Sequence, residues 1–248
     1  AEGKSIAYVD EKVLFVPNTV PGDIVDVQVT RKRKSFLEGF IVNVRKYSDI
    51  RTEPFCSHFG ICGGCKWQNL PYQLQTEFKQ QEIIDNLQRI GKVELQNVSP
   101  IIGSPKTTYY RNKLEYTFCN KRFLTREEIA NGQDIDRTPA VGFHVPGLFD
   151  KVIDIEKCYL QAEPSNGVRN FIREYAIEHE LSFYDIREQA GFLRTLIIRT
   201  SSTGEVMVIV TFGEENREAR EGLLNAIMQQ FPEITSLMYV INEKMNDT

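Results

Sequence analysis

Three cysteines lie close together in the stretch CSHFGICGGC, residues 56–65. Its glycines allow the backbone to wrap closely around a bulky centre without side-chain clashes, and cysteine thiolates are soft ligands for zinc or iron–sulfur clusters. Regular periodicity stops between Pro54 and Pro71, which indicates a loop rather than a strand or a helix. We therefore expect a metal-binding loop with one domain before it and another after it.

The residues before this loop alternate short apolar runs with turn signals. The runs cover residues 5–9, 12–16 and 24–29, and the intervening turns contain Asp10-Glu11 and Pro21-Gly22-Asp23. Short strands at such even spacing are typical of a small β-barrel. We expect an all-β barrel over residues 1–54.

The loop and the residues after it read as one mixed domain over 55–248. A helix is predicted from Tyr72 to Ile90, where Phe78, Ile84 and Leu87 recur near helical spacing. Strands are expected at 110–120, near Val141 and Val152, and at 193–200, 205–212 and 237–241; helices are expected around 168–176 and 223–228. Strands joined by hairpins and broken by two helices favour an α+β domain with an antiparallel sheet, and the polar segment 121–138 is predicted to be an inserted surface loop.

A four-ligand metal site needs one more residue than the loop supplies. Cys119 falls inside a predicted strand, whereas Cys158 follows one, and its position in a loop favours Cys158. The single C-x2-C spacing does not decide between an iron–sulfur cluster and structural zinc, which usually pairs two such knuckles. Buried, incidental thiols are the remaining interpretation, and three cysteines within ten positions argue against it.

Composition and charge narrow the function classes. The chain has 248 residues and a net charge of −4, so RNA binding would need a local basic patch rather than a generally basic surface. Five cysteines without an export signal do not suggest a disulfide framework. The longest apolar runs fall far short of the roughly 20 residues that span a bilayer, so we expect a cytoplasmic protein with no membrane partner.

Two basic segments are candidate RNA contacts. Arg31, Lys32, Arg33 and Lys34 follow a predicted strand, and the nearby Phe36 could stack on a base. An ordinary solvated hairpin is an equally good interpretation, because residues 1–54 contain nine basic and eight acidic residues, which nearly cancel in charge. In the second segment, strand alternation would place Arg111 and Lys113 on one face, which is also common on exposed strands.

Four landmarks in order resemble a known family. Residues 56–68 match C-x5-C-G-G-C-x2-Q, and they are followed by Tyr110-Arg111-Asn112-Lys113, Gly142-Phe143-His144 and Asp154-Ile155-x2-Cys158. This series resembles the RNA uracil-C5 methyltransferases of the type that modifies bacterial 23S rRNA. The opening residues, through Pro21-Gly22-Asp23, are similar to the TRAM domain, an RNA-binding barrel at the front of many members.

The resemblance implies a [4Fe–4S] cluster on Cys56, Cys62, Cys65 and Cys158, with Cys119 as a structural strand residue. It also implies a monomeric enzyme that uses S-adenosylmethionine to methylate 23S rRNA. The methyl-transferring domain, with its nucleophilic cysteine and general base, is not found in these residues, so the chain alone is expected to bind RNA without methylating it. The helix at 72–92 would then pack on that missing domain.

Two other classes of function remain open at this stage. A stand-alone RNA-binding module would combine the barrel with a structural four-cysteine metal site and catalyse nothing. An iron–sulfur redox protein would need an exposed cluster, whereas Phe55, Phe59, Ile61 and Trp67 flank the cysteines.

Overall fold

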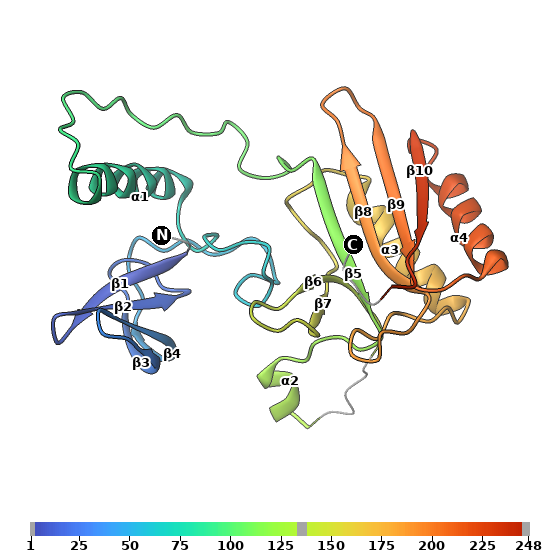
Figure 1. Cartoon of the computed structure of the whole chain (residues 1–248), viewed down its shortest axis with the longest axis horizontal. Helices are drawn as coiled ribbons and strands as arrows, with labels where there is room; N and C mark the ends of the chain where they lie inside the picture. Colours follow the sequence, from blue (N-terminus) through green and yellow to red (C-terminus); the bar gives the residue numbers. More distant parts are fainter. Residues whose placement is uncertain (1–2, 133–137, 245–248) are drawn as a thin grey trace. The chain divides into compact units, whose positions relative to one another are not determined.

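The computed structural model describes residues 3–132 and 138–244 (Figure 1). The chain forms two compact units: unit 1 contains Ala1–Gly60 and Cys65–Thr107, and unit 2 contains Ile61–Gly64 and Thr108–Thr248. The boundary predicted at residue 54 does not coincide with this division. The reason is that residues beyond 54 bind back to the first sheet and its flanks, as when the Thr52 N–H donates to the Asn69 carbonyl at 3.1 Å.

Unit 1 begins with a four-stranded sheet in the order β1-β2-β4-β3. Its strands are β1 (Lys4–Val9), β2 (Lys12–Pro17), β3 (Ile24–Lys32) and β4 (Phe36–Lys46). Leu14 and Val16, at alternate positions of β2, are buried together with Leu37 of β4, and Val27 and Ile41 pack against them. The closed barrel expected from the sequence is not seen: in the described part of the chain β1 and β3 are the two edges, and four strands are few for closure.

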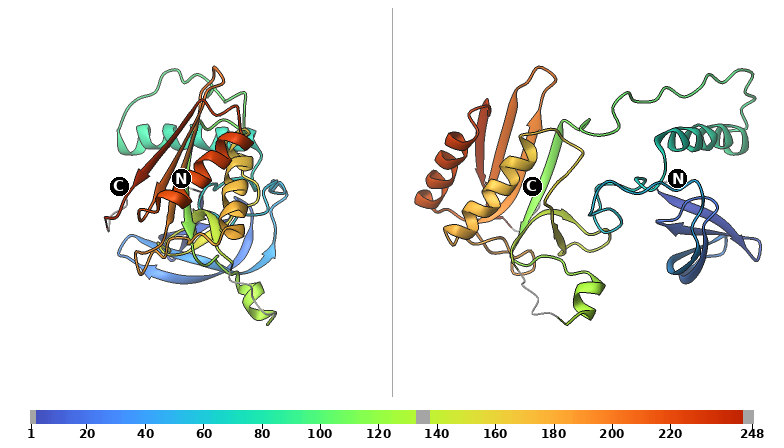
Figure 2. Two further views of the ribbon diagram at one scale, coloured as in Figure 1. Left: turned by 90° about the vertical axis from the view of Figure 1, so that its right-hand side faces the viewer. Right: turned by 180° about the vertical axis from the view of Figure 1, so that it is seen from behind.

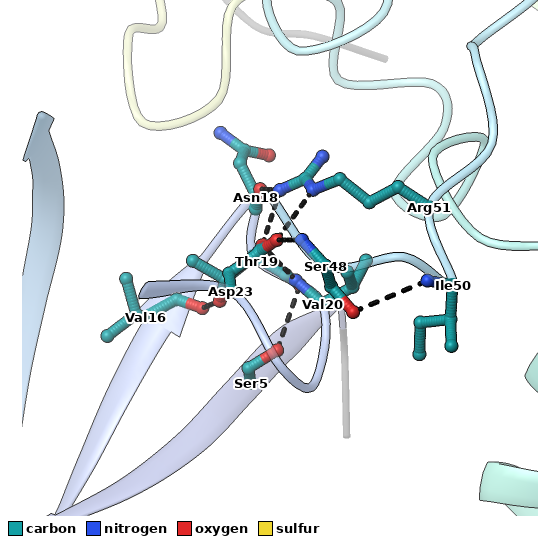
Figure 3. Close-up of polar contacts among 9 residues, drawn as sticks. All are labelled: Ser5, Val16, Asn18, Thr19, Val20, Asp23, Ser48, Ile50 and Arg51. Atoms are coloured by element: carbon teal, nitrogen blue, oxygen red, sulfur yellow. Dashed lines mark hydrogen bonds and ion pairs between the residues drawn. The ribbon is translucent and has the colours of Figure 1, made fainter. Parts of the chain in front are cut away.

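A buried ion pair fastens the turn after β2 to the segment after β4 (Figure 3). The Asp23 carboxylate accepts two hydrogen bonds from the Arg51 guanidinium, at 2.8 and 2.6 Å. It also accepts the backbone N–H groups of Val20 at 2.8 Å and Ser48 at 3.0 Å. Burial opposes ionisation of Asp23, but the hydrogen bonds from Arg51 and the two backbone groups, together with the Arg51 charge, hold its pKa below its ordinary value.

The predicted helix after the cysteine loop is present as α1 (Tyr72–Asp85), which continues into the single π-helical turn η1 (Asn86–Ile90). The Gln75 side chain donates to the carbonyls of Trp67 and Leu70 and so anchors the first turn. The segment after η1 returns along α1, because the Gln80 side chain donates to the Ser99 carbonyl at 3.2 Å.

Unit 2 is built on a six-stranded sheet in the order β10-β9-β8-β5-β6-β7. Its strands are β5 (Lys113–Cys119), β6 (Ala140–His144), β7 (Val152–Asp154), β8 (Leu193–Thr200), β9 (Val206–Phe212) and β10 (Ser236–Ile241). Helices α3 (Ser165–Glu178) and α4 (Arg217–Gln230) lie on one side of it (Figure 2). Side chains between the sheet and these helices are buried. Among them are Leu196 and Ile198 of β8, Val208 and Val210 of β9, and Ile172 of α3.

The expectation of a fully antiparallel sheet is wrong at one edge. β10 pairs with β9 in parallel, from Ser236 opposite Met207 to Ile241 opposite Phe212. The cause is the helix between them: β9, α4 and β10 form a crossover, which returns the chain to the same end of the sheet. The other ladders of this sheet are antiparallel.

The segment predicted as an inserted loop contains the short helix α2 (Arg126–Ala130), which begins with a capping box between Thr125 and Glu128. Part of the predicted loop, residues 133–137, lies outside the described residues. Within the described ranges, no helix is both long enough and apolar enough to cross a membrane.

Candidate functional site

The predicted basic patch lies at the tip of the β3–β4 hairpin. The Arg31 guanidinium contacts the Glu38 carboxylate at 3.2 Å, and Lys4 Nζ reaches the same carboxylate at 3.5 Å. The hydrogen bond from Arg31, together with the charges of both cations, holds the pKa of Glu38 below its ordinary value despite partial desolvation. Arg31 is therefore partly neutralised within unit 1.

The other three cations of the patch are exposed. Lys32, Arg33 and Lys34 make no ion pair with any residue in the described ranges, and the Arg33 N–H donates to the Phe36 carbonyl at 2.8 Å to close the tip. Three unneutralised cations on one tight turn can contact consecutive phosphates of a nucleic-acid backbone.

The aromatic predicted to accompany the patch is only partly available. Phe36 is half-buried and packs edge-on against Phe15, with ring centroids 5.9 Å apart. Pairing of Ile6 with Phe15 and of Tyr8 with Val13 places these strand residues on one surface of the sheet. Tyr8, at 74% exposure, is the open aromatic there, and sequence reasoning missed it because alternation does not show which face stays uncovered.

The second predicted pair, Arg111 and Lys113, is not arranged as alternation suggested. β5 starts only at Lys113, because Tyr109 takes a left-handed conformation with φ of 54° and the Arg111 N–H donates to the Leu160 carbonyl at 2.8 Å. Arg111 therefore lies in a bend before the strand. Lys113 is on β5, where its Nζ lies 3.3 Å from the Glu115 carboxylate.

The four predicted cluster cysteines divide equally between the units. Cys56 and Cys65 belong to unit 1, and Cys62 and Cys158 to unit 2. Nowhere in residues 3–132 and 138–244 do three cysteine, histidine or acidic side chains gather closely enough to hold a metal ion. The four-cysteine site stays a prediction.

Some of the contacts around the loop cysteines are those expected of cysteine sulfurs that bind a metal cluster. The Gly64 N–H donates to Cys62 Sγ at 3.3 Å, a contact of the kind that stabilises cluster thiolates. A side chain at Gly63 would place its Cβ 3.0 Å from the His144 carbonyl, which accounts for glycine at that position. In unit 1 the Cys56 N–H donates to the Gln68 side chain at 3.2 Å. Phe55 is 51% exposed, contrary to a fully shielded loop.

Cys158 is buried and held by its backbone. The Asn166 side chain accepts from the Cys158 N–H at 2.7 Å and donates to the Cys158 carbonyl at 3.1 Å. Arg169, which is 0% exposed, donates to Asn166 at 3.0 Å and to the Glu156 carbonyl at 2.6 Å. Its guanidinium carbon lies 5.1 Å from the centroid of the Tyr116 ring, in a cation–π contact. The first turns of α3 therefore fix the turn that carries Cys158.

Cys119 behaves as the structural residue that was predicted. It lies at the end of β5, 4% exposed, and packs with Ala140 and Val152. Burial raises the pKa of its thiol, an effect that a backbone hydrogen bond with Lys121 only partly offsets. A thiol held protonated in this way is a poor nucleophile.

Apolar residues of α1 and η1 remain partly uncovered by this chain. Phe78 is 40% exposed, Leu87 39% and Ile90 79%, and Ile84 is half-buried. A cavity of about 530 Å³ separates this face from β1 and is lined by Ile6, Trp67 and Phe78 among others. The stripe predicted to pack on a further domain is thus not covered by the chain's own sheet.

Comparison with known proteins gives the following matches. Residues 1–42 match the TRAM domain. Over its whole length the chain is 55% identical to an uncharacterized RNA methyltransferase of Bacteroides thetaiotaomicron and covers 55% of that protein. It is 51% identical to one of Porphyromonas gingivalis, of which it covers 54%.

A solved structure shares the fold at lower identity. The Pyrococcus abyssi tRNA (uracil-54, C5)-methyltransferase, in complex with S-adenosyl-L-homocysteine, matches all of this chain and 53% of its own, with a TM-score of 0.63 and 23% identity. The chain thus spans about half the length of the relatives it matches. The chain therefore matches the TRAM domain over residues 1–42 and is similar along all 248 residues to proteins named RNA methyltransferases.

Proposed function

We propose that these residues form the RNA-recognising part of an S-adenosylmethionine-dependent RNA uracil-C5 methyltransferase that acts on 23S rRNA. The observation that carries the proposal is the identity of 55% and 51%, along the whole chain, to proteins named RNA methyltransferases. The uracil-C5 chemistry is supported by the order of the four sequence landmarks and by the fold shared with a uracil-C5 enzyme. The relatives' greater length favours an enzyme over a stand-alone binding module.

In this proposal the residues of the chain bind and orient RNA. The hairpin tip of Lys32, Arg33 and Lys34 supplies phosphate contacts, and the exposed Tyr8 offers a ring for stacking. Bound S-adenosylmethionine would supply the methyl group. Methylation at C5 also needs a thiolate that adds to C6 and a base that removes the C5 proton. Cys119 does not suit the first role, because it is buried and its pKa is raised.

The test of RNA recognition uses the 248-residue protein and its hairpin. In a triple variant, Lys32→Gln, Arg33→Gln and Lys34→Gln, filter binding to 23S rRNA should weaken, and the slope of log affinity against log salt should fall by about two. The control, Lys32→Arg, Arg33→Lys and Lys34→Arg, keeps the charges and should bind like the unsubstituted protein. Equal binding by both variants would refute the role of the hairpin, and tighter binding to tRNA than to 23S rRNA would refute the proposed target.

A methyl-transfer assay tests the division of labour. The 248-residue protein, given S-adenosylmethionine and 23S rRNA, should bind the RNA and incorporate no methyl group above background. Methylation of uracil by these residues alone would overturn the proposal that catalysis resides elsewhere in the parent protein.

We also propose a [4Fe–4S] cluster on Cys56, Cys62, Cys65 and Cys158. Soft thiolates and the N–H donor to Cys62 Sγ are the chemistry that such a cluster uses. Anaerobically purified protein should contain about four iron atoms per chain, and Cys158→Ser should lose most of them. Cys119→Ser is the matched control and should keep them. Stoichiometric zinc, or unchanged iron in Cys158→Ser, would contradict the assignment.

A further inference from the structure

The sheet of unit 2 has one face that its helices do not cover. Side chains that point toward α3 and α4 are fully buried, as Leu196, Ile198 and Val208 are, whereas the alternate residues Ile197 and Ile209 are only half-buried. The two views agree on this arrangement: strands β8 and β9 lie in front of α3 in Figure 1, and the helices lie in front of the strands in the rear view of Figure 2. We call the helix-free side the open face.

Strand register places two cations opposite each other on this face. Lys113 of β5 pairs with Arg199 of β8, and Arg199 pairs with Met207 of β9. Directly opposite residues of an antiparallel ladder share a face, with Cβ atoms about 4.5–5.5 Å apart. The two positions are 86 residues apart in sequence, so the pairing of β5 with β8 is what brings them together.

The charges around this pair are not balanced. Lys113 has a partner in Glu115 at 3.3 Å, with both side chains over two-fifths exposed. Arg199 is exposed and makes no ion pair with any residue in the described ranges. Its β9 neighbour Met207 is neutral, and the Glu205 carboxylate in the β8–β9 turn is occupied by the hydroxyls of Ser201 and Thr203.

Physical chemistry favours an anion at this place. Like charges directly opposite each other in a sheet destabilise the pair unless a counter-ion lies between them. A guanidinium offers a planar fork of donors that matches the two free oxygens of a phosphate, and an adjacent ammonium adds a point charge.

We propose that Arg199, together with Lys113, is a second RNA-backbone site, which binds a phosphate against the open face of unit 2. The site rests on the proposed RNA-binding function and adds to it a residue that the sequence landmarks do not contain. It is separate from the hairpin cations of unit 1, so each unit would contribute its own phosphate contacts and both would add to the salt dependence of binding.

The test compares two arginines of unit 2 that differ in the face they occupy. Arg199→Gln is measured beside Arg217→Gln, which removes an exposed cation of α4 on the helical side of the sheet. The probes are fluorescein-labelled oligo(U) and 23S rRNA, titrated at several salt concentrations. Circular dichroism and urea unfolding check that both variants fold.

Arg199→Gln should weaken binding several-fold and lower the slope of log affinity against log salt by about one, whereas Arg217→Gln should change neither. Arg199→Lys should restore the slope but only part of the affinity, because it keeps the charge without the planar fork. If the unsubstituted chain binds RNA and Arg199→Gln matches Arg217→Gln, the open-face site is refuted while the proposed function stands. If the unsubstituted chain binds neither probe, both proposals fail.

Discussion

Replacing Asp23 by asparagine removes the carboxylate of the buried ion pair in unit 1 and leaves the side chain nearly the same size. The Asp23 side chain is 1% exposed and that of Arg51 19%. Asparagine keeps one carbonyl oxygen, but its NH2 group replaces the second acceptor, where the donors of Val20 and Arg51 converge. The guanidinium then loses its counter-charge while it remains largely out of water.

The expected cost is about 3 kcal/mol, since removing one partner of a buried, hydrogen-bonded pair typically costs 3–5 kcal/mol and Arg51 retains some solvent contact. The effect should depend on pH in a defined direction. The pKa of Asp23 is lowered on folding, so its contribution is fully present above its unfolded value of about 3.9 and is lost as pH falls through the lower, folded value. The difference between the two proteins should be constant at neutral pH and shrink in acid.

Urea unfolding followed by tryptophan fluorescence measures this effect selectively, because the chain has one tryptophan, Trp67, and it belongs to unit 1. The matched control is Asp26→Asn, which breaks a surface pair with Arg45 whose side chains are 45% and 63% exposed. That change should cost less than about 1 kcal/mol. Equal losses for the two variants, or a loss at Asp23 that does not shrink in acid, would refute the reasoning.

Two further predictions concern unit 2. Arg169→Ala should destabilise it by about 3 kcal/mol, because it leaves a cavity in place of a fully buried side chain and removes the hydrogen bonds of its guanidinium to Asn166 and Glu156. Arg173→Ala, which removes a partly exposed pair with Asp154, should cost about 1 kcal/mol, and equal urea midpoints would contradict this ranking. Gly142→Ala should cost more than about 2 kcal/mol, since its Cβ would lie 2.0 Å from the Ile153 carbonyl in the β6–β7 ladder. Gly147→Ala, where a Cβ meets open space, should cost only the strain of its positive φ, about 1 kcal/mol, and thermal unfolding that ranks the two the other way would show the clash to be relieved.

The local pattern of apolar and polar residues is enough to predict where most strands and helices lie, but it does not predict how the strands pair. β8 was predicted at 193–200 and occupies Leu193–Thr200, because its alternation of buried and half-buried residues is carried by its own side chains. The direction of β10 could not be read from alternation, which is the same in parallel and antiparallel ladders; the helix between β9 and β10 was the available signal. Arg111 was placed wrongly because hydrogen bonds to Tyr159 and Leu160, fifty residues away, bend the chain before β5 begins.

The difference between local pattern and strand pairing also separates the candidate metal-binding cysteines from the candidate phosphate-binding arginine. Cysteine spacing is a local property, so the loop cysteines and the position of Cys158 after a strand could be proposed from the sequence. Arg199 has no motif around it, and its relation to Lys113 exists only in the register of β5 and β8. Residues that act through pairing across a sheet are therefore the ones that sequence reasoning misses.

The surroundings of Cys158 decide how its substitution should be interpreted. A buried cation without a carboxylate is costly unless other acceptors surround it, and Arg169 makes no ion pair with any described acid. Its acceptors are instead the Glu156 carbonyl and the side chains of Asn170 and Asn166. The Asn166 side chain also binds the N–H and carbonyl groups of Cys158. These bonds hold the backbone of the turn, and serine at position 158 would keep every one of them. Loss of iron from Cys158→Ser would therefore report the missing sulfur rather than collapse of the turn, whereas loss of iron from Arg169→Ala would report the turn itself.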